Sequence, residues 1–362
     1  MFLLKKHEKG AGALNDTTLA EFLTPHWRIH RQRLVFLAQL VVSLVLVRTV
    51  SWSRLANAVD SPKAGAAAYR RIQRLFGWVG LSQESYCGMV LGLVGNRRLT
   101  LVMDRTDWKL GQRPLNILML GFVWQGIAIP LVWTVLGKSG SSNMAERIEL
   151  MQRLFGIQPQ LQFQVEAFLA DREFIGDDWL GYLREQGLRR CIRIRKNFRT
   201  GLETKGASAD TFFRHLAVGQ QQTLKRRKRI NGELMYLVGL RLENDYLIVA
   251  TDLRPEQGLS TYGLRWGIET LFGCLKSRGF NLEQTHVTQS DKLSRLLILL
   301  ATAVLWAFSA GLWLHKKQPI PLKKHGRRAI SFFRLGLDYL ERLIRERSFP
   351  LPVNLLRLLS CT

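Results

Sequence analysis

The sequence contains few cysteines and no cysteine-based motif. The four cysteines are Cys87, Cys191, Cys274 and Cys361. No two of them form a C-x-x-C pair, which argues against a thiolate zinc site and against a disulfide framework. The seven histidines provide no H-E-x-x-H motif, and the pair His26 and His30 has no third ligand nearby. This usage fits a reducing cytosol, so we expect a cytoplasmic protein.

Acidic residues are scarce relative to basic ones. The 362 residues include 28 Asp and Glu against 53 Lys and Arg, which gives a net charge of +25. A positive charge this large favours a polyanionic partner, either nucleic acid or an anionic membrane surface. The hydrophobic fraction of 47% is enough for two or three modules with cores of their own.

Two long uncharged segments could be membrane-spanning helices or buried core helices. Residues Leu296–Leu314 carry no charge and are long enough to span a bilayer, whereas Leu34–Val47 is too short. The longer run contains Thr302 and Ser309, and the N-terminus does not resemble a signal peptide. A helix buried on all sides of a large core has the same composition. We therefore expect a core helix and no membrane partner.

The N-terminal part is predicted to be helical and basic. Leu34–Val47 reads as a buried helix, Ser51 or Ser53 can cap a second helix that ends near Val59, and Asp60–Lys63 forms a turn. A third helix is predicted over Gly65–Phe76.

The predicted third helix has one apolar and one basic side. Its inward residues are expected to be Tyr69, Ile72 and Phe76, and its basic strip consists of Arg70, Arg71 and Arg74. A helix, a short turn and a basic helix are typical of a helix-turn-helix DNA-binding unit, although any basic helical hairpin has the same pattern. We expect residues 1–95 to form a helical DNA-binding region.

From residue 99 the pattern changes to short strands. Leu99–Asp104 is an apolar strand that ends on a carboxylate, and Gln162–Ala170 is a second one, followed by Asp171. Between them, Asn116–Leu136 reads as two strands joined by a tight turn, with its proline at a sheet edge. An amphipathic helix is predicted over Ser142–Phe155. The chain therefore reads as α/β.

Residues 262–276 read as one helix with a polar and an apolar side. The polar positions are Tyr262, Arg265, Glu269 and Lys276, and the apolar positions are Ile268, Leu271, Phe272 and Leu275. A surface helix with an ordinary Arg–Glu pair four residues apart would look the same. A carboxylate between two cations and a phenol also suits a site where the carboxylate binds metal and the cations bind phosphate.

Asp104, Asp171 and Glu269 together form a candidate catalytic trio. Such carboxylates can hold two divalent cations, one activating the attacking oxygen and one stabilising the leaving oxygen of a phosphodiester. Hard oxygen ligands favour magnesium or manganese over zinc. Each aspartate also has a local reading, an Asx turn for Asp104 and a helix N-cap for Asp171. The nearby acids Asp107 and Glu173 are interpreted as supporting or surface groups rather than ligands.

These residues resemble those of a known family. The spacing Tyr262-x2-Arg265-x3-Glu269-x6-Lys276 is similar to the Tyr-Arg-Glu-Lys signature of insertion-sequence transposases of family four, and Asp104 and Asp171 resemble the first two members of its DDE triad. The resemblance implies an α/β fold with an RNase-H-like mixed-sheet catalytic core and a mostly β insertion. The implied regions are helical DNA-binding residues 1–95, core residues 96–196, insertion 197–252, core residues 253–314 and a basic helical C-terminal region, 315–362.

The resemblance also implies a reaction and partners. Two Mg or Mn ions per site, held by the trio, would serve hydrolysis at the transposon end and then attack of its 3′-hydroxyl on target DNA. The partners would be double-stranded DNA, as terminal inverted repeats and target, and a second subunit in a DNA-bound homodimer. A bacterial cytoplasmic protein, associated with the nucleoid when bound, would be expected.

The same resemblance assigns DNA contacts. Arg265 and Lys276 would bind phosphates, and Tyr262 would add a hydroxyl. Trp266 matches a position at which some relatives stack a flipped base, but it reads equally well as a core residue. Residues 180–265 contain no tryptophan, which puts a DNA-hairpin route in doubt.

The implied insertion has strand and charge signals of its own. Leu234–Leu240 and Tyr246–Thr251 read as a hairpin. Before it lie Lys225, Arg226 and Arg227, which either contact DNA or form a solvated charge run. The alternative function for the whole chain is a non-transposing RNase-H-like structure-selective endonuclease. It would need the same trio but only hydrolysis.

Overall fold

The computed structural model describes residues 16–346, apart from 26, 28, 60–64, 96, 202–205 and 325. The predicted turn at residues 60–63 and the end of the chain after residue 346 lie outside this part. The chain divides into two compact units. The first comprises residues 1–96, 108–115 and 271–362, and the second comprises residues 97–107 and 116–270.

The strands form one mixed sheet of nine within the described residues. They are β1 (Arg98–Leu110), β2 (Arg113–Trp124), β3 (Ile127–Leu136), β4 (Gln164–Ala170), β5 (Arg190–Ile194), β6 (Gln221–Thr223), β7 (Lys228–Ile230), β8 (Glu233–Arg241) and β9 (Tyr246–Thr251). Their order is β3-β2-β1-β4-β5-β9-β8-β6, and β7 pairs with β8 on a separate path. The chain is therefore a mixed α/β protein, as predicted.

The parallel centre of the sheet brings two aspartates together. β1 runs parallel to β4, and the last pair of this ladder is Met103 with Ala170. Asp104 and Asp171 are the next residues of the two strands. The prediction that β1 ends at Asp104 was wrong, because this strand continues to Leu110 beside β2. Asp104 therefore lies where the parallel pairing stops, within a longer strand.

The β2–β3 hairpin confirms the two predicted strands and their turn. Gln125 and Gly126 both have positive φ, 52° and 89°. A two-residue hairpin turn needs these angles to match the right-handed twist of the strands on either side. Pro130 lies in edge strand β3, where its missing N–H costs no ladder bond to a further strand. It stands opposite Gly121, at which the register shifts.

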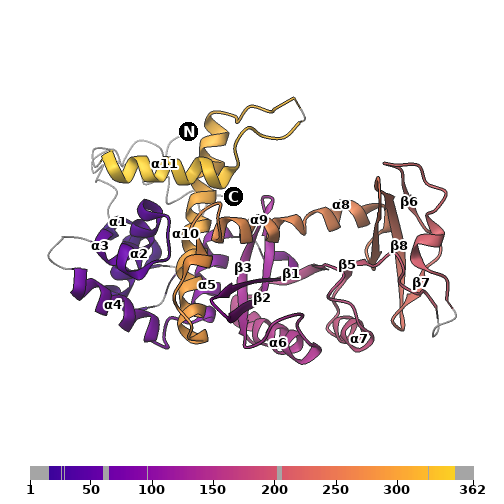
Figure 1. Ribbon diagram of the computed structural model, residues 1–362, viewed down its shortest axis with the longest axis horizontal. Coiled ribbons are helices and arrows are strands. Elements are labelled where there is room, and N and C mark those ends of the chain that lie inside the picture. Colours follow the sequence, from indigo (N-terminus) through magenta and orange to yellow (C-terminus); the bar gives the residue numbers. More distant parts are fainter. Residues whose placement is uncertain are drawn as a thin grey trace, which may run out of the picture. The chain divides into compact units, whose positions relative to one another are not determined.

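Four helices of the second unit lie on the two sides of the sheet. They are α6 (Met144–Leu161), α7 (Asp177–Glu185), α8 (Gly258–Gly263) and α9 (Trp266–Leu275), of which α9 continues into the first unit. Figure 1 shows α6 and α7 on one side of the strands and α8 on the other. Asn143 and Glu146 form a capping box that fixes the start of α6. α8 lies against β5 and β9.

The first unit is helical. Its helices are α1 (Asp16–Leu23), α2 (Arg31–Val47), α3 (Trp52–Ala58), α4 (Gly65–Gly77), α5 (Gln83–Val94), α10 (Ser290–Lys317) and α11 (Phe332–Glu346). Figure 1 shows α11 crossing the upper part of α10. The crossing is close because Gly311 lies against the backbone of Phe332, and Gly336 against that of Ala307. A side chain at either glycine would push the helices apart.

Helix α10 is the predicted core helix. It is long and apolar enough to cross a membrane, yet 89% of its apolar window is buried inside the structure. Helix α4 differs from its prediction at one residue. Ile72 and Phe76 are buried, but Tyr69 is 37% exposed and meets the edge of the Trp52 ring at the surface.

Candidate active site

The predicted catalytic helix is broken in two. α8 ends at Gly263 and α9 begins at Trp266, so the prediction of one continuous helix was wrong. Across the break the backbone bonds span three residues instead of four, from Arg265 N–H to the Tyr262 carbonyl and from Ile268 N–H to the Arg265 carbonyl. Side chains three residues apart eclipse in such a turn. The Arg265 guanidinium consequently lies over the Tyr262 ring, 5.6 Å from its centre.

A glycine seats this break against the sheet. An added Cβ at Gly267 would lie 2.9 Å from the backbone nitrogen of Ala128, at the start of β3. This close approach holds the first turn of α9 on the β2–β3 hairpin. The predicted apolar residues of α9 are all buried: Ile268, Leu271, Phe272 and Leu275.

Arg265 joins two of the three predicted catalytic carboxylates. Its Nη1 donates to Asp104 Oδ2 at 2.9 Å, and its Nη2 donates to Glu269 Oε1 at 2.5 Å. The third carboxylate, Asp171, accepts a bond from the Tyr262 hydroxyl at 3.2 Å. The structure therefore brings Asp104, Asp171 and Glu269 to one place. Each of them contacts a side chain of the Tyr262–Glu269 segment.

The last signature residue is Lys276, and Trp266 directly follows Arg265 in the chain. Lys276 belongs to the first unit, where it pairs with Glu283 at 2.9 Å and lies 5.5 Å from the centre of the Trp108 ring. The predicted single polar stripe was wrong for Tyr262 and Arg265, because they precede α9 and share no continuous helix with Glu269. Trp266 is 59% exposed, so it is not the core residue that was one reading of the sequence.

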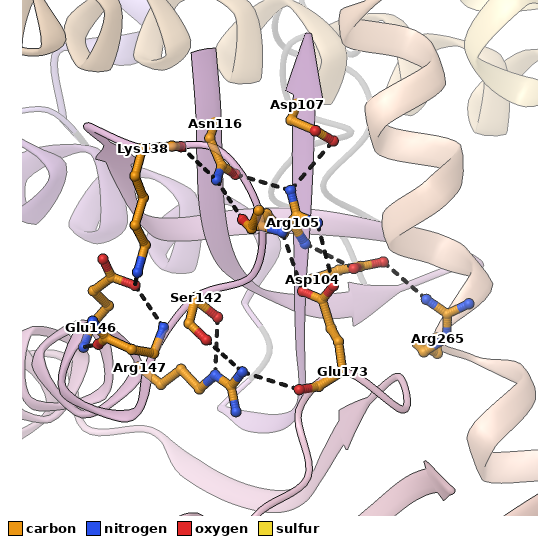
Figure 2. A network of polar contacts seen from close by, with 12 residues as sticks. Asp104, Arg105, Asp107, Asn116, Lys138, Ser142, Glu146, Arg147, Glu173 and Arg265 are labelled. Atoms are coloured by element: carbon orange, nitrogen blue, oxygen red, sulfur yellow. Dashed lines mark hydrogen bonds and ion pairs between the residues drawn. The ribbon is translucent and has the colours of Figure 1, made fainter. Parts of the chain in front are cut away.

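A second polar network, which the sequence did not predict, surrounds the residue after Asp104. The next residue, Arg105, forms bonds of 3.4 Å to both carboxylate oxygens of Glu173 and lies 3.4 Å from Asp107. Arg105 also donates to the Asn116 side chain, which donates in turn to two carbonyls of the loop after β3. Figure 2 shows this network beside the Asp104–Arg265 pair. The network fixes the strand on which Asp104 lies.

Arg147 holds the loop that follows Asp171. This arginine of α6 is buried and donates to the Ser142 side chain and carbonyl and to the Glu173 carbonyl. Its ring contact is Phe174, 5.0 Å away. The expected supporting role of Asp107 and Glu173 agrees with these contacts. The only sequence signals for the network were an asparagine inside an apolar strand and an arginine in a helix next to apolar residues.

Burial changes the acid–base properties of the cluster. Desolvation raises the pKa of Asp104 to about 6, although the Arg105 N–H and the Arg265 charge oppose the shift. Burial also raises the pKa of the Tyr262 hydroxyl, so this group stays protonated as a donor to Asp171. The pKa of Arg265 is raised despite its burial, because Tyr262 and Asp104 favour the charged form.

The three carboxylates are suitable ligands for a hard divalent cation, but their side chains are not arranged to hold one. Carboxylate oxygens with exchangeable partners are the ligands that Mg²⁺ and Mn²⁺ prefer. Within the described residues, however, no three Asp, Glu, His or Cys side chains are arranged to hold one metal ion. The reason is visible at the trio, where a guanidinium lies between the carboxylates of Asp104 and Glu269.

The other predicted DNA-binding residues lie on exposed surfaces. The α4 arginines Arg70, Arg71 and Arg74 are exposed, and the guanidinium of Arg71 lies 4.0 Å from the centre of the Phe36 ring. In the second unit, Lys225, Arg226 and Arg227 are exposed in the segment before β7, with Arg227 over the Tyr236 ring. These positions are open to a ligand, and their role stays a prediction.

The site and fold define a class of protein, an α/β chain with an acidic cluster at the ends of two parallel strands. Residues 130–306 match the family model described as "Transposase DDE domain". Asp171 and Glu269 lie inside the matched residues, and Asp104 lies before them. Residues 130–306 therefore form a transposase DDE domain, and the chain is an enzyme that cleaves and joins DNA strands. Enzymes of this class generally use divalent metal ions.

One solved structure similar to the chain is a piggyBac transposase synaptic complex with hairpin DNA, determined by cryo-electron microscopy. The two chains are 13% identical, and the match covers 98% of this chain and 78% of that one with a TM-score of 0.40. No protein of curated function matches the chain.

Proposed function

We propose that this transposase belongs to insertion-sequence family four and acts on the terminal inverted repeats of its own element. It cuts at each end and joins the freed 3′-hydroxyl to target DNA. The observation that carries the proposal is the convergence of Asp104, Asp171 and Glu269 on the Tyr262–Glu269 segment. Their order and spacing along the chain match the signature of that family.

Each residue of the cluster has a role in this proposal. Asp104, Asp171 and Glu269 would hold two Mg²⁺ or Mn²⁺ ions, which activate the attacking oxygen and stabilise the leaving oxygen of the phosphodiester. Arg265 and Lys276 bind phosphate oxygens near the cleaved end, and Tyr262 adds a hydroxyl contact. Trp266 is exposed beside Arg265 and offers a ring face to a nucleotide.

The rest of the chain is assigned to DNA binding and core. The helices of residues 1–95 contact DNA through Arg70, Arg71 and Arg74. Residues 96–196 and 253–314 form an RNase-H-like core. The strands of residues 197–252 form an insertion that contacts phosphates through Lys225, Arg226 and Arg227. Supporting this assignment, the net charge is +25 and all six cations are exposed.

The proposal extends to assembly and location. Two element ends must be held together for insertion, which favours a homodimer on DNA, with the basic region of residues 315–362 contacting DNA or the second subunit. Cytoplasmic action on the nucleoid agrees with the scarcity of cysteine.

The test is an end-joining assay with the full chain. A duplex carrying the inverted repeat that flanks the gene is incubated with supercoiled plasmid and Mg²⁺. We expect nicking at the repeat, followed by joined products that contain its 3′-end. The matched control is Glu256→Gln, an exposed acid outside the cluster, which should join normally. Cleavage without joining under every condition would make the chain a structure-selective nuclease instead.

A further inference from the structure

The carboxylates proposed to bind metal accept hydrogen bonds from two side chains of one short turn. Within this turn, Tyr262 donates to Asp171, and Arg265 donates to both Asp104 and Glu269. The Arg265 side chain is only 4% exposed, so its positive charge lies in a buried position between the two carboxylates. Two carboxylates at a buried position stabilise a cation between them, whether it is a guanidinium or a metal ion.

The guanidinium is not fully satisfied there. Arginine has five N–H donors, and among the described residues the buried Nε of Arg265 has no hydrogen-bond partner. A phosphate group offers several oxygens that match the planar fork of a guanidinium. A DNA phosphate would therefore provide Arg265 with a better set of acceptors than the carboxylates do.

The backbone around Arg265 is suited to a change of position. Two three-residue hydrogen bonds replace the usual helical ones on either side of this residue, and Leu264 and Trp266 beside it are both exposed. A short tightened stretch inside a helix often marks a functional hinge. Because Arg265 precedes the first residue of α9, we expect that it can turn toward the surface without unwinding this helix.

We propose that Arg265 occupies the metal position of the DNA-free enzyme and leaves it when a DNA phosphate binds the guanidinium. The inference rests on the proposed role of the trio as metal ligands. Without DNA, an incoming divalent ion must displace a buried arginine that then has no anion to pair with. With DNA, the displaced arginine binds phosphate, so metal loading is coupled to the presence of the substrate.

The coupling has a reciprocal consequence. If DNA raises the affinity for the metal by some factor, the metal raises the affinity for DNA by the same factor. Couplings of this kind range from about 5-fold to about 150-fold. The enzyme would then bind the metal pair more weakly while free in solution, which limits hydrolysis of unrelated phosphodiesters.

The test measures Mn²⁺ binding to the full chain by electron paramagnetic resonance. Wild type and Arg265→Gln are titrated alone and with a pre-cleaved duplex that ends at the terminal repeat and has no bond left to cut. For wild type we expect the duplex to tighten Mn²⁺ binding about tenfold or more. Arg265→Gln should bind Mn²⁺ about as tightly without DNA as wild type does with it, and the duplex should add little.

A second variant keeps the test valid if Arg265→Gln does not fold. Tyr262→Phe keeps the buried ring and releases only Asp171, so it should raise the DNA-free Mn²⁺ affinity by less than Arg265→Gln does. The proposal is overturned if wild type binds Mn²⁺ equally well with and without the duplex, or if neither variant raises the DNA-free affinity.

The double variant Asp104→Asn/Arg265→Gln separates the two hypotheses. If it loses the Mn²⁺ that Arg265→Gln binds, the ion is held by the trio, as the inference requires. If it binds Mn²⁺ as well as Arg265→Gln does, the trio is not the metal site. The proposed function of these carboxylates and the inference about Arg265 then both fail.

Discussion

Gly267 sets the distance between the catalytic helix and the sheet, and its replacement by alanine is a direct test of that geometry. The added Cβ would lie 2.9 Å from Ala128 N, where ordinary contact begins at 3.4 Å. Since the neighbour is backbone of β3, the first turn of α9 must move by about half an ångström. Overfilling of this kind costs about 1–3 kcal/mol of stability.

The larger effect of Gly267→Ala is expected in the reaction. Catalytic groups must be held within about 0.5 Å, and a 1 Å displacement can cost about a hundredfold in rate. Because Gly267 lies between Arg265 and Glu269, we expect the rate of end cleavage to fall about tenfold or more. The assay is single-turnover cleavage of a labelled terminal-repeat duplex in Mg²⁺, with thermal unfolding measured in parallel.

The matched control is Gly263→Ala in the last turn of α8. There an added Cβ meets nothing within 4 Å, and φ is not positive. This variant should keep wild-type cleavage and gain up to about 1 kcal/mol of stability, because alanine has less backbone freedom to lose. Equal rates for the two alanine variants would refute the claim that the Gly267 contact positions Glu269.

Three further predictions concern stability. The pKa of Asp104 is about 6 in the folded protein, above its unfolded value of 3.8, so its contribution to the free energy of unfolding is greatest near pH 4 and declines as pH rises through 6. Denaturant titrations without metal should show the stability of wild type relative to Asp104→Asn falling by about 2 kcal/mol between pH 4 and 7. A difference that does not change with pH would contradict the shift. Arg190→Gln removes a buried arginine that binds Asp252 through two nitrogens, and the free energy of unfolding measured in urea should fall by about 3–5 kcal/mol. A fall of under about 1 kcal/mol would contradict the importance of this ion pair. Gly336→Ala places a methyl group on the Ala307 carbonyl and should destabilise the α10–α11 crossing by at least about 1–3 kcal/mol in thermal unfolding, so an unchanged midpoint would refute the close contact.

The elements that the sequence predicted are those with a clear period or a local signal. Two apolar runs separated by a short polar turn located β8 and β9, and the Gln125–Gly126 turn located the hairpin of β2 and β3. The proximity of Asp104 and Asp171 was also predictable, because each follows an apolar strand and parallel strands end at the same edge.

The break at Arg265 could not be predicted, because it depends on contacts made across the fold. Residues 262–276 have continuous helical periodicity, whereas the close approach of Gly267 to the β3 backbone beside the tightened turn is seen only in the folded chain. Arg105 and Arg147 received no role in the sequence analysis for a related reason. Both bind Glu173, which lies 68 residues after Arg105 and 26 residues after Arg147.

The most direct test of the central claim is a comparison of three single substitutions on one DNA end. Asp104→Asn, Asp171→Asn and Glu269→Gln are each assayed for Mg²⁺-dependent cleavage of the terminal-repeat duplex and, in Ca²⁺, for its binding. We expect all three variants to lose cleavage while they bind the duplex within a few-fold of wild type. Cleavage at the wild-type rate by any one of them would show that its carboxylate is not part of the active site.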